Sequence, residues 1–359
     1  MKTRVSRKAT AVAAAASTLL LAMTALAQAQ PASSDGTRPR AAGSVATAPL
    51  AGFRILLSND DSMQMARPNA SDGKGLYEVR RALCAAGADV VVIAPWANQS
   101  GAGTGSTSGG QLTVERRTAL PPGYAHDCSG APAEGAVYGV CKGASPCGPA
   151  SQSATPADTV RLALGGGLAA KTGWTDGPGL VVSGANYGQN VASVVNDSGT
   201  VGAALAAIEE GVPAVALSSS YDPTVTTSLE VADRTYRETG EFAADFIGQL
   251  RRRDLLRPDF VVNVNYPYLP QGQRPRGTAW TSVGTQKLVK SVYAGSGNTF
   301  TIGSALCDPA TEGCRPETKR DADFATLQRG YVTVTPVGPD RTYTGVRDAR
   351  LAAYVRTHR

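Results

Sequence analysis

Short, continuously apolar segments alternate along this chain with stretches of helical spacing, and this alternation constrains the fold more than any other feature. Residues 53–58 (FRILLS) and 89–94 (DVVVIA) predict strands, the second one buried on both faces of a sheet, and residues 74–86 between them have the apolar spacing of a helix. A strand, a helix and a second strand in this order predict a right-handed βαβ unit. The same pattern predicts later strands at 179–183, 214–218, 260–265 and 330–336, and helices at 158–171, 201–210 and 229–253. The glycine triplet at 165–167 is expected to end the first of these helices.

The pattern changes after Pro267. Residues 277–305 mostly alternate between polar and apolar side chains and contain turn signals, which predicts a β-hairpin-rich extension over residues 270–320. Residues 125–153 carry three cysteines among Gly, Pro and Ser, and we interpret them as an irregular insertion. The sequence therefore predicts one large α/β unit with an appended β excursion.

The first 29 residues have the features of a secretory signal peptide. A positively charged start precedes an uncharged apolar run over residues 11–26, and small residues follow at cleavage spacing. The alternative is a membrane anchor, but the run is short for a span and lacks a stop-transfer pattern. We expect an exported protein, periplasmic or secreted, with no membrane association after cleavage and a flexible N-terminus over residues 30–51.

The charge balance excludes a role in binding a nucleic-acid duplex. The chain has 35 basic and 29 acidic residues, and the leader holds four of the basic ones, so the mature chain is nearly balanced. A basic face is required for nucleic-acid binding. The one dense basic run, Arg251–Arg253, is expected at the exposed end of a helix, where it complements the helix dipole.

Six cysteines in an exported chain predict disulfides. Cys307 and Cys314 are a candidate pair, and two of Cys128, Cys141 and Cys147 are expected to pair. Cys84 lies on the apolar side of a predicted helix and is expected to be a buried free thiol. A zinc site is excluded, because the chain has no CxxC motif and only two histidines.

Polar clusters follow three of the predicted strands. In a doubly wound sheet, ligands bind beyond the carboxyl ends of the strands, so the fold can bring these clusters together. Adjacent carboxylates repel each other unless a cation or hydrogen bonds offset their charge. The oxygen ligands of such a site suit Mg²⁺ or Mn²⁺ and would come from Asp60, Asp61, Ser100 and Asn186. The alternative for Asp60 and Asp61 alone is a turn or a helix cap.

Other polar residues have simpler alternatives. Ser198-Gly199-Thr200 opens a helix and could hold a phosphate, or Ser198 could be an ordinary N-cap. Asp158 is expected to cap its helix. Asn263 and Asn265 point to one face of a strand, where one could reach the site or both could fix backbone. His126 has no activating arrangement around it, which argues against a covalent histidine mechanism.

Seven segments of the chain resemble, in the same order, the segments of the SurE family of 5′/3′-nucleotidases. They span residues 53–340 and read FRILLSNDD, APWANQSGAG, TPADTVRLAL, VVSGANYGQNV, SGTVGAALAAIEEGVPAVALS, VVNVNYP and DFATLQRGYVTVTP. The resemblance implies a Rossmann-like three-layer α/β sandwich with a mostly parallel sheet, covering residues 52–340, and a hairpin extension used in homodimer or homotetramer assembly. A C-terminal tail follows at 341–359.

The resemblance also implies metal-activated hydrolysis of nucleoside 5′- or 3′-monophosphates. The family's metal-binding positions match Asp60, Asp61, Ser100 and Asn186. Its phosphate-pocket positions match Asn190, Ser198, Gly199 and Thr200. Asn59 precedes the aspartates as in the family and is also expected to bind the substrate. Ser62 replaces the usual glycine of the NDDG motif, and the loop after it is longer than usual, which leaves substrate choice open.

Our mechanistic hypothesis is direct hydrolysis, in which Asp60 orients or deprotonates a water while Asn190 and residues 198–200 stabilise the phosphoryl oxygens. A covalent aspartyl-phosphate route is the enzymatic alternative. A periplasmic binding protein that has kept the fold without turnover is the alternative from another class.

Overall fold

The computed structural model describes residues 48–67, 72–222, 231–308, 310, 313–341 and 353–356. The predicted signal peptide lies outside the described residues, as does most of the predicted flexible N-terminus. Most of the predicted C-terminal tail also lies outside them, and residues 353–356 are helical. Within the described ranges, no helix combines the length and the apolar character needed to cross a membrane.

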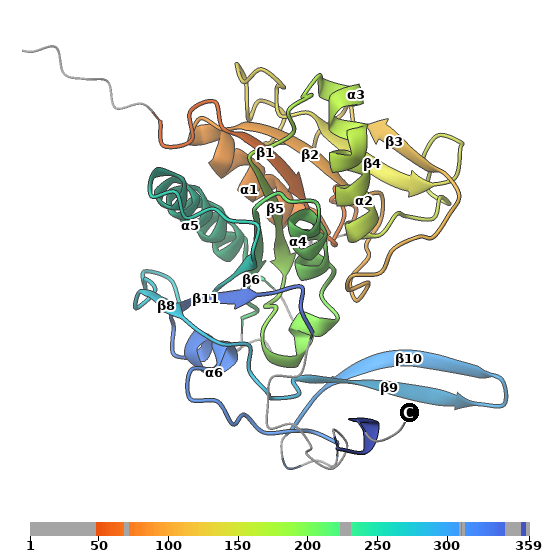
Figure 1. Cartoon of the computed structure of the whole chain (residues 1–359), viewed down its shortest axis with the longest axis vertical. Helices are drawn as coiled ribbons and strands as arrows, with labels where there is room; N and C mark the ends of the chain where they lie inside the picture. The colour runs from red at the N-terminus through yellow and green to blue at the C-terminus, as the bar shows by residue number, and fades with distance from the viewer. Residues whose placement is uncertain are drawn as a thin grey trace, which may run out of the picture. The chain divides into compact units, whose positions relative to one another are not determined.

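A nine-stranded sheet forms the centre of the fold (Figure 1), with the strand order β3-β4-β2-β1-β5-β6-β7-β11-β8. The strands from β4 to β7 in this order run parallel, whereas β3 pairs antiparallel with β4 and β11 pairs antiparallel with β7. The strands are β1 (Arg54–Ser58), β2 (Asp89–Pro95), β3 (Leu112–Arg116), β4 (Val137–Lys142), β5 (Leu180–Tyr187), β6 (Ala214–Ser219), β7 (Val261–Tyr266), β8 (Thr278–Trp280) and β11 (Val332–Val337).

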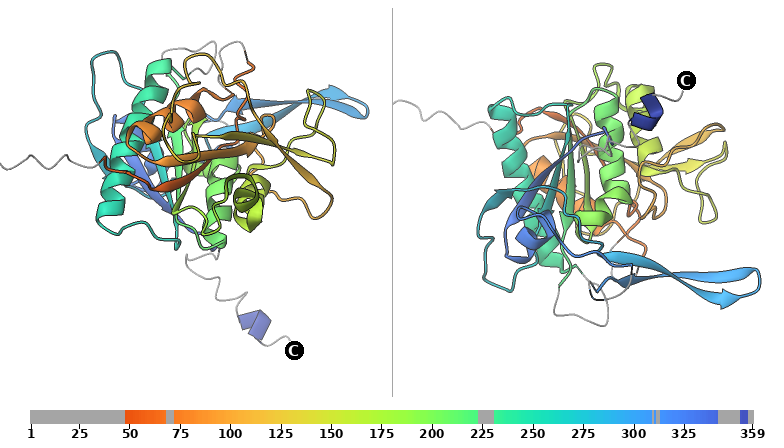
Figure 2. Two further views of the ribbon diagram at one scale, coloured as in Figure 1. Left: turned by 90° about the horizontal axis from the view of Figure 1, so that it is seen from above. Right: turned by 60° about the horizontal axis from the view of Figure 1, so that its bottom comes forward.

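Helices cover both faces of this sheet (Figure 2). Along β1, Ile55 and Leu57 pack into a core with α1 and α5, whereas Leu56 packs into a second core with α2 and α4. This alternation is the reason that the strands are apolar throughout. The predicted Rossmann-like three-layer fold with a mostly parallel sheet is confirmed. The helices are α1 (Lys74–Ala85), α2 (Pro156–Leu162), α3 (Leu168–Thr172), α4 (Gly199–Glu209), α5 (Asp233–Arg252) and α6 (Asp323–Gln328).

Two expectations about helix ends were wrong. The glycines at 165–167 were expected to end the helix, but residues 163–167 form a π-helical turn, in which Gly166 has φ 123°, and α3 continues beyond it. Asp158 was expected to cap α2. The cap is instead Thr155, whose side chain accepts a hydrogen bond of 3.1 Å from the Asp158 amide.

The segment that was expected to be irregular, 125–153, contains the sheet strand β4, which pairs with β2. Gly139 lies within β4, and a Cβ there would come within 2.2 Å of the Met63 side chain and 2.7 Å of the Trp96 ring. A glycine in a strand usually marks such a close approach. The turn-like composition around β4 hid a strand whose glycine is needed for packing.

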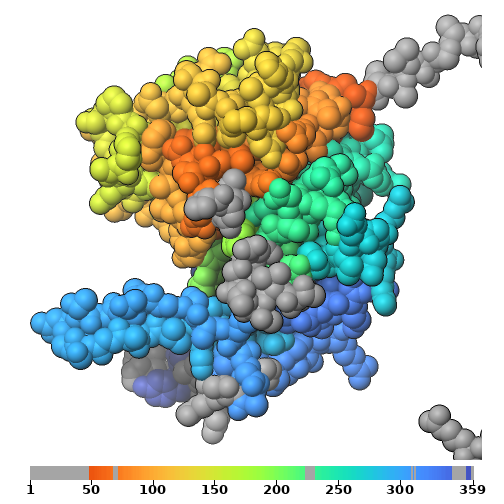
Figure 3. Space-filling model, turned by 180° about the vertical axis from the view of Figure 1, so that it is seen from behind, coloured from red at the N-terminus to blue at the C-terminus, as the bar shows by residue number. Residues whose placement is uncertain are grey.

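The predicted C-terminal hairpin is confirmed. β9 (Val289–Ser296) and β10 (Thr299–Leu306) form a two-stranded antiparallel sheet that protrudes from the surface (Figure 3). Several of its large apolar side chains are more than half exposed, namely Tyr293, Phe300, Ile302 and Leu306.

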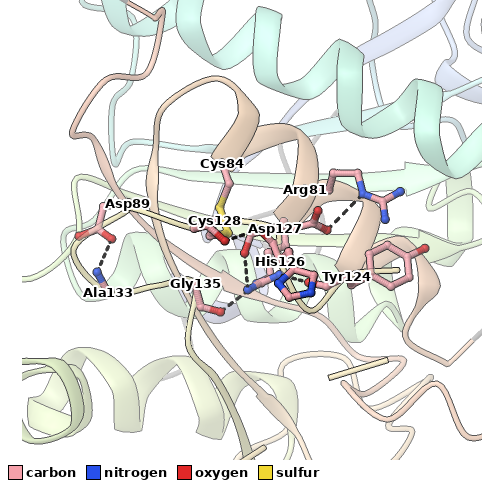
Figure 4. The surroundings of a disulfide bond; sticks show 11 residues. Arg81, Cys84, Asp89, Tyr124, His126, Asp127, Cys128, Ala133 and Gly135 are labelled. Carbon is pink, nitrogen blue, oxygen red and sulfur yellow. Dashed lines mark hydrogen bonds and ion pairs between the residues drawn. A yellow bond between two sulfur atoms is a disulfide. The ribbon is translucent and has the colours of Figure 1, made fainter. Parts of the chain in front are cut away.

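All six cysteines form disulfides, and the expectation of a free Cys84 was wrong. The expected Cys307–Cys314 bond is present, and Cys141 bonds Cys147. Cys84 on α1 bonds Cys128 (Figure 4). The fully buried Arg80 on the same helix donates hydrogen bonds to the carbonyl oxygens of Tyr124, Asp127 and Gly135, so α1 holds residues 124–135 by two independent means.

Candidate active site

The predicted polar clusters meet where the strand order reverses. The chain runs from β1 to β2 on one side of β1 and later returns to β5 on its other side. In open α/β sheets this switch point forms the ligand-binding crevice at the carboxyl ends of the strands. Residues 59–61 follow β1, residues 98–100 follow β2, and Asn186 lies near the end of β5.

Asp60 is only 3% exposed and lies against the first turn of α4. The Thr200 hydroxyl donates a hydrogen bond of 2.6 Å to its Oδ1. A Cβ on Gly199 would come within 2.7 Å of the Asp60 Cβ, so only glycine permits this approach of helix to carboxylate. A carboxylate at a helix N-terminus is favoured by the helix dipole.

Asp61 is equally buried and faces the ends of β2 and β5. Its Oδ2 accepts a hydrogen bond of 2.7 Å from the Tyr187 backbone amide. Its Oδ1 is approached by the Asn98 amide at 3.4 Å and by the Ser100 hydroxyl at 3.5 Å, and the Asn98 amide also donates to the Ser100 hydroxyl at 3.1 Å. The three clusters predicted from the sequence therefore do converge on this carboxylate.

Burial raises the pKa of both aspartates. For Asp61, burial is the largest cause and the neighbouring Asp60 charge is the second. For Asp60, burial outweighs the hydrogen bonds from the Thr200 side chain and from nearby backbone, which act to lower its pKa. Two adjacent buried carboxylates are unfavourable as anions unless a cation joins them.

Asn59 fixes the turn that carries the aspartates. Its side-chain amide donates to the Ser62 carbonyl oxygen at 2.9 Å, and its Oδ1 accepts from the Ser62 amide at 3.2 Å. Asn59 is fully buried, and both its side-chain nitrogen and its side-chain oxygen bond to the backbone of this turn, so its observed contacts are structural.

Asn190 is held by both asparagines of β7. Its amide donates to Oδ1 of Asn265 at 2.7 Å, and its carbonyl oxygen accepts from Asn263 at 2.9 Å and from Asn265 at 3.1 Å. Of the two alternatives for Asn263 and Asn265, the structure shows backbone fixation. The Asn190 side chain donates to the Ser218 hydroxyl at 3.0 Å and retains a second N–H.

Ser198 is the N-cap of α4, and its hydroxyl accepts a hydrogen bond of 3.1 Å from the Val201 amide. The simpler alternative for this residue is therefore what the structure shows. The triplet 198–200 still lies beside Asp60, because Gly199 and Thr200 both contact that residue.

The donor set fits a hard divalent cation better than zinc. Within the described residues, no group of three or more His, Cys, Asp or Glu side chains could hold a metal. The site instead offers two carboxylates and the Ser100 hydroxyl. Asn186, whose nitrogen donates to the Gly188 carbonyl oxygen at 2.8 Å, precedes Tyr187 on β5, and the Tyr187 amide binds Asp61. Carboxylate, hydroxyl and amide oxygens are ligands that Mg²⁺ and Mn²⁺ prefer.

Comparison with known proteins identifies the family. Residues 55–290 match the profile of the family described as Survival protein SurE. The chain belongs to the SurE family. A relative from Rubrobacter xylanophilus named "5'-nucleotidase SurE" is 31% identical over 297 residues, covering 81% of this chain and 94% of the relative. One of the same name from Desulfitobacterium hafniense is 30% identical over 303 residues, covering 83% and 96%.

The fold is also similar to that of a SurE protein of known structure. The crystal structure of the SurE protein from Aquifex aeolicus covers 84% of this chain, and this chain covers 99% of it, with a TM-score of 0.54 and 23% identity. This likeness concerns the fold alone.

Some residues of this SurE site could not be found individually from the sequence. Asn98 was seen only as part of a polar cluster, yet its side chain lies between Asp61 and Ser100. Tyr187 contributes through its backbone amide, which no side-chain pattern reveals, and Tyr221 packs edge-on against it with ring centroids 5.3 Å apart. Ser218, near the end of β6, accepts a hydrogen bond from the Asn190 side chain. The sequence indicated it only weakly, as a polar residue that follows an apolar run.

Proposed function

We propose that this chain is a divalent-metal-dependent phosphomonoesterase that hydrolyses nucleoside 5′-monophosphates to nucleoside and phosphate. The observation that carries the proposal is the pair of buried carboxylates, Asp60 and Asp61, at the switch point of the sheet. Membership of the SurE family and relatives named 5'-nucleotidase SurE support the reaction class. Cleavage of 3′-monophosphates is part of the proposal as a second activity.

The cation would be held by Asp60, Asp61, Ser100 and Asn186, and it would be Mg²⁺ or Mn²⁺. When bound, such an ion offsets the charge of the phosphate and makes a water more acidic. Asp61 is oriented for this role by the Tyr187 amide, and Asp60 by the Thr200 hydroxyl.

Asp60 would orient the attacking water and accept its proton through the carboxylate oxygen that Thr200 does not occupy. The water oxygen forms a bond to phosphorus while the bond from phosphorus to the nucleoside oxygen breaks, and the leaving oxygen takes up the proton that Asp60 accepted from the water, which restores the carboxylate. The free N–H of the Asn190 side chain and the first amides of α4 would stabilise charge on the phosphoryl oxygens.

The test is phosphate release by the purified mature protein from a panel of nucleoside 5′- and 3′-monophosphates and an aryl phosphate, with Mg²⁺, with Mn²⁺ and with EDTA. We expect release that requires metal and is abolished in Asp61→Ala. Asp176→Asn, which removes an exposed carboxylate at a distant turn, is the matched control and should keep full activity. Nucleotide binding without release under any metal would instead favour a non-catalytic binding protein.

We also propose that the protein is exported, as the leader sequence predicts. The three disulfides support export, because such bonds persist in oxidising compartments and are rare in the cytosol. Mass determination of the protein recovered from the periplasm or medium would test this, since the proposal requires loss of the leader.

We further propose assembly into a homodimer or homotetramer through the β9–β10 hairpin. The exposed side chains of Tyr293, Phe300 and Ile302 support it, because Ile302 pairs with Tyr293 across the hairpin and clustered apolar surface of this kind marks interaction sites. Light scattering of the wild type and of Ile302→Lys tests it, and a monomeric wild type would contradict it.

A further inference from the structure

A short loop closed by a disulfide follows β4, the strand that pairs with β2. Cys141 is buried in β4 and bonds Cys147, six positions further along the chain. The chain then returns to the strand, because Ser153 forms an antiparallel bridge with Cys141. Loop 143–152 is therefore held at one end by the disulfide and at the other by backbone pairing.

This loop holds the two residues at the end of β2. The indole nitrogen of Trp96 donates a hydrogen bond of 2.9 Å to the Gly148 carbonyl oxygen. The Ala97 amide donates one of 3.1 Å to the Ser153 hydroxyl. Because Gly148 directly follows Cys147, the disulfide limits where the acceptor of the indole can lie.

Trp96 is also seated on β4. Its backbone amide donates to the Val140 carbonyl oxygen at 3.0 Å, and its ring would lie 2.7 Å from a Cβ on Gly139. The Gln64 side chain, from the loop after the aspartates, donates to the Trp96 carbonyl oxygen at 3.1 Å. Trp96 therefore joins the disulfide loop to the carboxyl edge of the sheet.

The residues after Ala97 reach both aspartates. The Gln99 amide donates to the Asp60 carbonyl oxygen at 2.7 Å. The Asn98 side chain donates to Oδ1 of Asp61 at 3.4 Å and to the hydroxyl of the next serine, the proposed metal ligand at position 100, at 3.1 Å. Only the backbone of segment 96–100 separates these contacts from the disulfide loop.

Segment 96–100 has little packing of its own beyond Trp96. Ala97 and Ser100 are exposed, and Asn98 and Gln99 are only partly buried. A segment with few buried contacts opens easily, so its position depends on the hydrogen bonds that hold it.

We propose that the Cys141–Cys147 disulfide positions the active site through Trp96, so that the site has its full metal affinity only in the oxidised protein. The inference rests on the proposed function. Groups that orient metal ligands from outside set the affinity of a metal site. A pair of thiols would release one end of loop 143–152, and the indole would lose its fixed acceptor. Because the cytosol keeps thiols reduced, the chain would gain full activity only in an oxidising compartment.

The experiment compares the wild type with Cys141→Ala/Cys147→Ala and with Trp96→Phe. Calorimetric titration with Mn²⁺ gives the metal affinity, and phosphate release from a nucleoside 5′-monophosphate gives kcat and KM. We expect each variant to bind Mn²⁺ about tenfold more weakly, the lower end of what the loss of a group orienting a metal ligand costs. Trp96→Phe keeps the disulfide and an aromatic ring against Gly139, so it tests the inference even where the double variant does not fold.

Combining the changes separates positioning from general destabilisation. The triple variant should bind Mn²⁺ no more weakly than the double variant, because Trp96 and the disulfide act through the same hydrogen bond. Cys307→Ala/Cys314→Ala is the matched control, since its bond joins residues seven positions apart instead of six, and it should keep wild-type affinity. Losses that multiply in the triple variant, or wild-type affinity in Trp96→Phe, would overturn the inference and leave the proposed function standing.

Reduction by a phosphine tests the oxidised state directly. The phosphine takes oxygen from water and becomes its oxide, while the two sulfurs of the opened bond become thiols. Once thiol titration shows that Cys141–Cys147 is open, the wild type should have the Mn²⁺ affinity of Cys141→Ala/Cys147→Ala, and this variant should lose nothing on the same treatment. Unchanged wild-type affinity, or an equal loss in both proteins, would overturn the inference. A wild type that neither binds Mn²⁺ nor releases phosphate would overturn the proposed function as well.

Discussion

The Thr200 hydroxyl and Oδ1 of Asp60 lie 2.6 Å apart, and this hydrogen bond joins the first turn of α4 to the loop after β1. Both residues are buried, so water cannot replace the donor. The orientation of the proposed general base therefore depends on a residue 140 positions away in the sequence.

Removing this donor should destabilise the fold. Thr200→Val keeps the branched shape and deletes the hydroxyl, and we expect a loss of about 1.5–3 kcal/mol in the free energy of unfolding, as for hydrogen bonds to charged groups. Thr200→Ser keeps the hydroxyl and is the control. Urea unfolding of both variants is the measurement, and equal stabilities would show that the bond contributes nothing.

The Cys84–Cys128 disulfide should stabilise the protein more than the Cys307–Cys314 bond. The two bonds join residues separated by 44 and 7 positions, and loop entropy alone predicts a difference of roughly 1.6 kcal/mol between them. Replacing each pair by alanines and measuring urea unfolding gives the two losses.

Hydrogen exchange provides a local check on the same bond. The backbone amides of residues 124–135 should exchange faster in the Cys84/Cys128 double-alanine variant than in the wild type. They should keep part of their protection, because Arg80 still donates hydrogen bonds to three carbonyl oxygens in this segment. A larger loss of stability from the Cys307/Cys314 pair would contradict the loop argument.

The layered fold and the convergence of the polar clusters could be predicted because both follow from local patterns. Apolar runs such as 89–94 identify buried strands, and the residues at their ends identify the binding edge. The order of strands in space then brings Asp61, Ser100 and the end of β5 together without any further information.

The failures involve contacts between distant segments. Cys84 was predicted to be a buried free thiol because its position on a helix gives no sign of its partner. Cys128 lies 44 residues further along the chain, in the segment 124–135 that Arg80 holds against α1 by hydrogen bonds. β4 was not predicted because a glycine such as Gly139 is usually a turn signal. The structure shows that a glycine is needed at this position because the Met63 side chain packs directly against it. Neither partner is visible from the residues that flank these positions.

Ser62 offers a test of the turn that follows the aspartates. At φ 90° a serine is strained, and strain of this kind costs about 1–3 kcal/mol. Its hydroxyl offsets part of this cost by donating to the Asp72 carbonyl oxygen at 3.0 Å and accepting from the Gln64 amide at 3.2 Å.

Two substitutions separate the two effects. Ser62→Ala keeps the strain and loses both hydrogen bonds, so it should be destabilised by about 1–3 kcal/mol. Ser62→Gly loses the same hydrogen bonds but relieves the backbone strain, so its stability should be closer to that of the wild type or exceed it. Thermal unfolding ranks the three proteins, and Ser62→Ala more stable than Ser62→Gly would exclude the strain argument.

Glu317 should make stability depend on pH in the acid range. Burial acts to raise its pKa, but hydrogen bonds from the backbone of Lys319, Thr285 and Gln286 and from the Thr285 hydroxyl prevail and lower it to about 2. In the unfolded chain a glutamate titrates near its usual value of about 4.3.

Because the folded pKa is the lower one, this stabilisation is complete above the unfolded pKa and is lost as the pH falls from about 4.5 towards 2. The difference in unfolding free energy between the wild type and Glu317→Gln should be constant from about pH 7 to 5.5 and shrink from pH 5 to pH 3. Its size is limited by solvent screening, since Glu317 is partly exposed. Glu210→Gln, at an exposed position at the end of α4, controls for the general change in charge. A gap between the wild type and Glu317→Gln that stays constant down to pH 3 would mean that the hydrogen bonds to Glu317 do not distinguish its charged form.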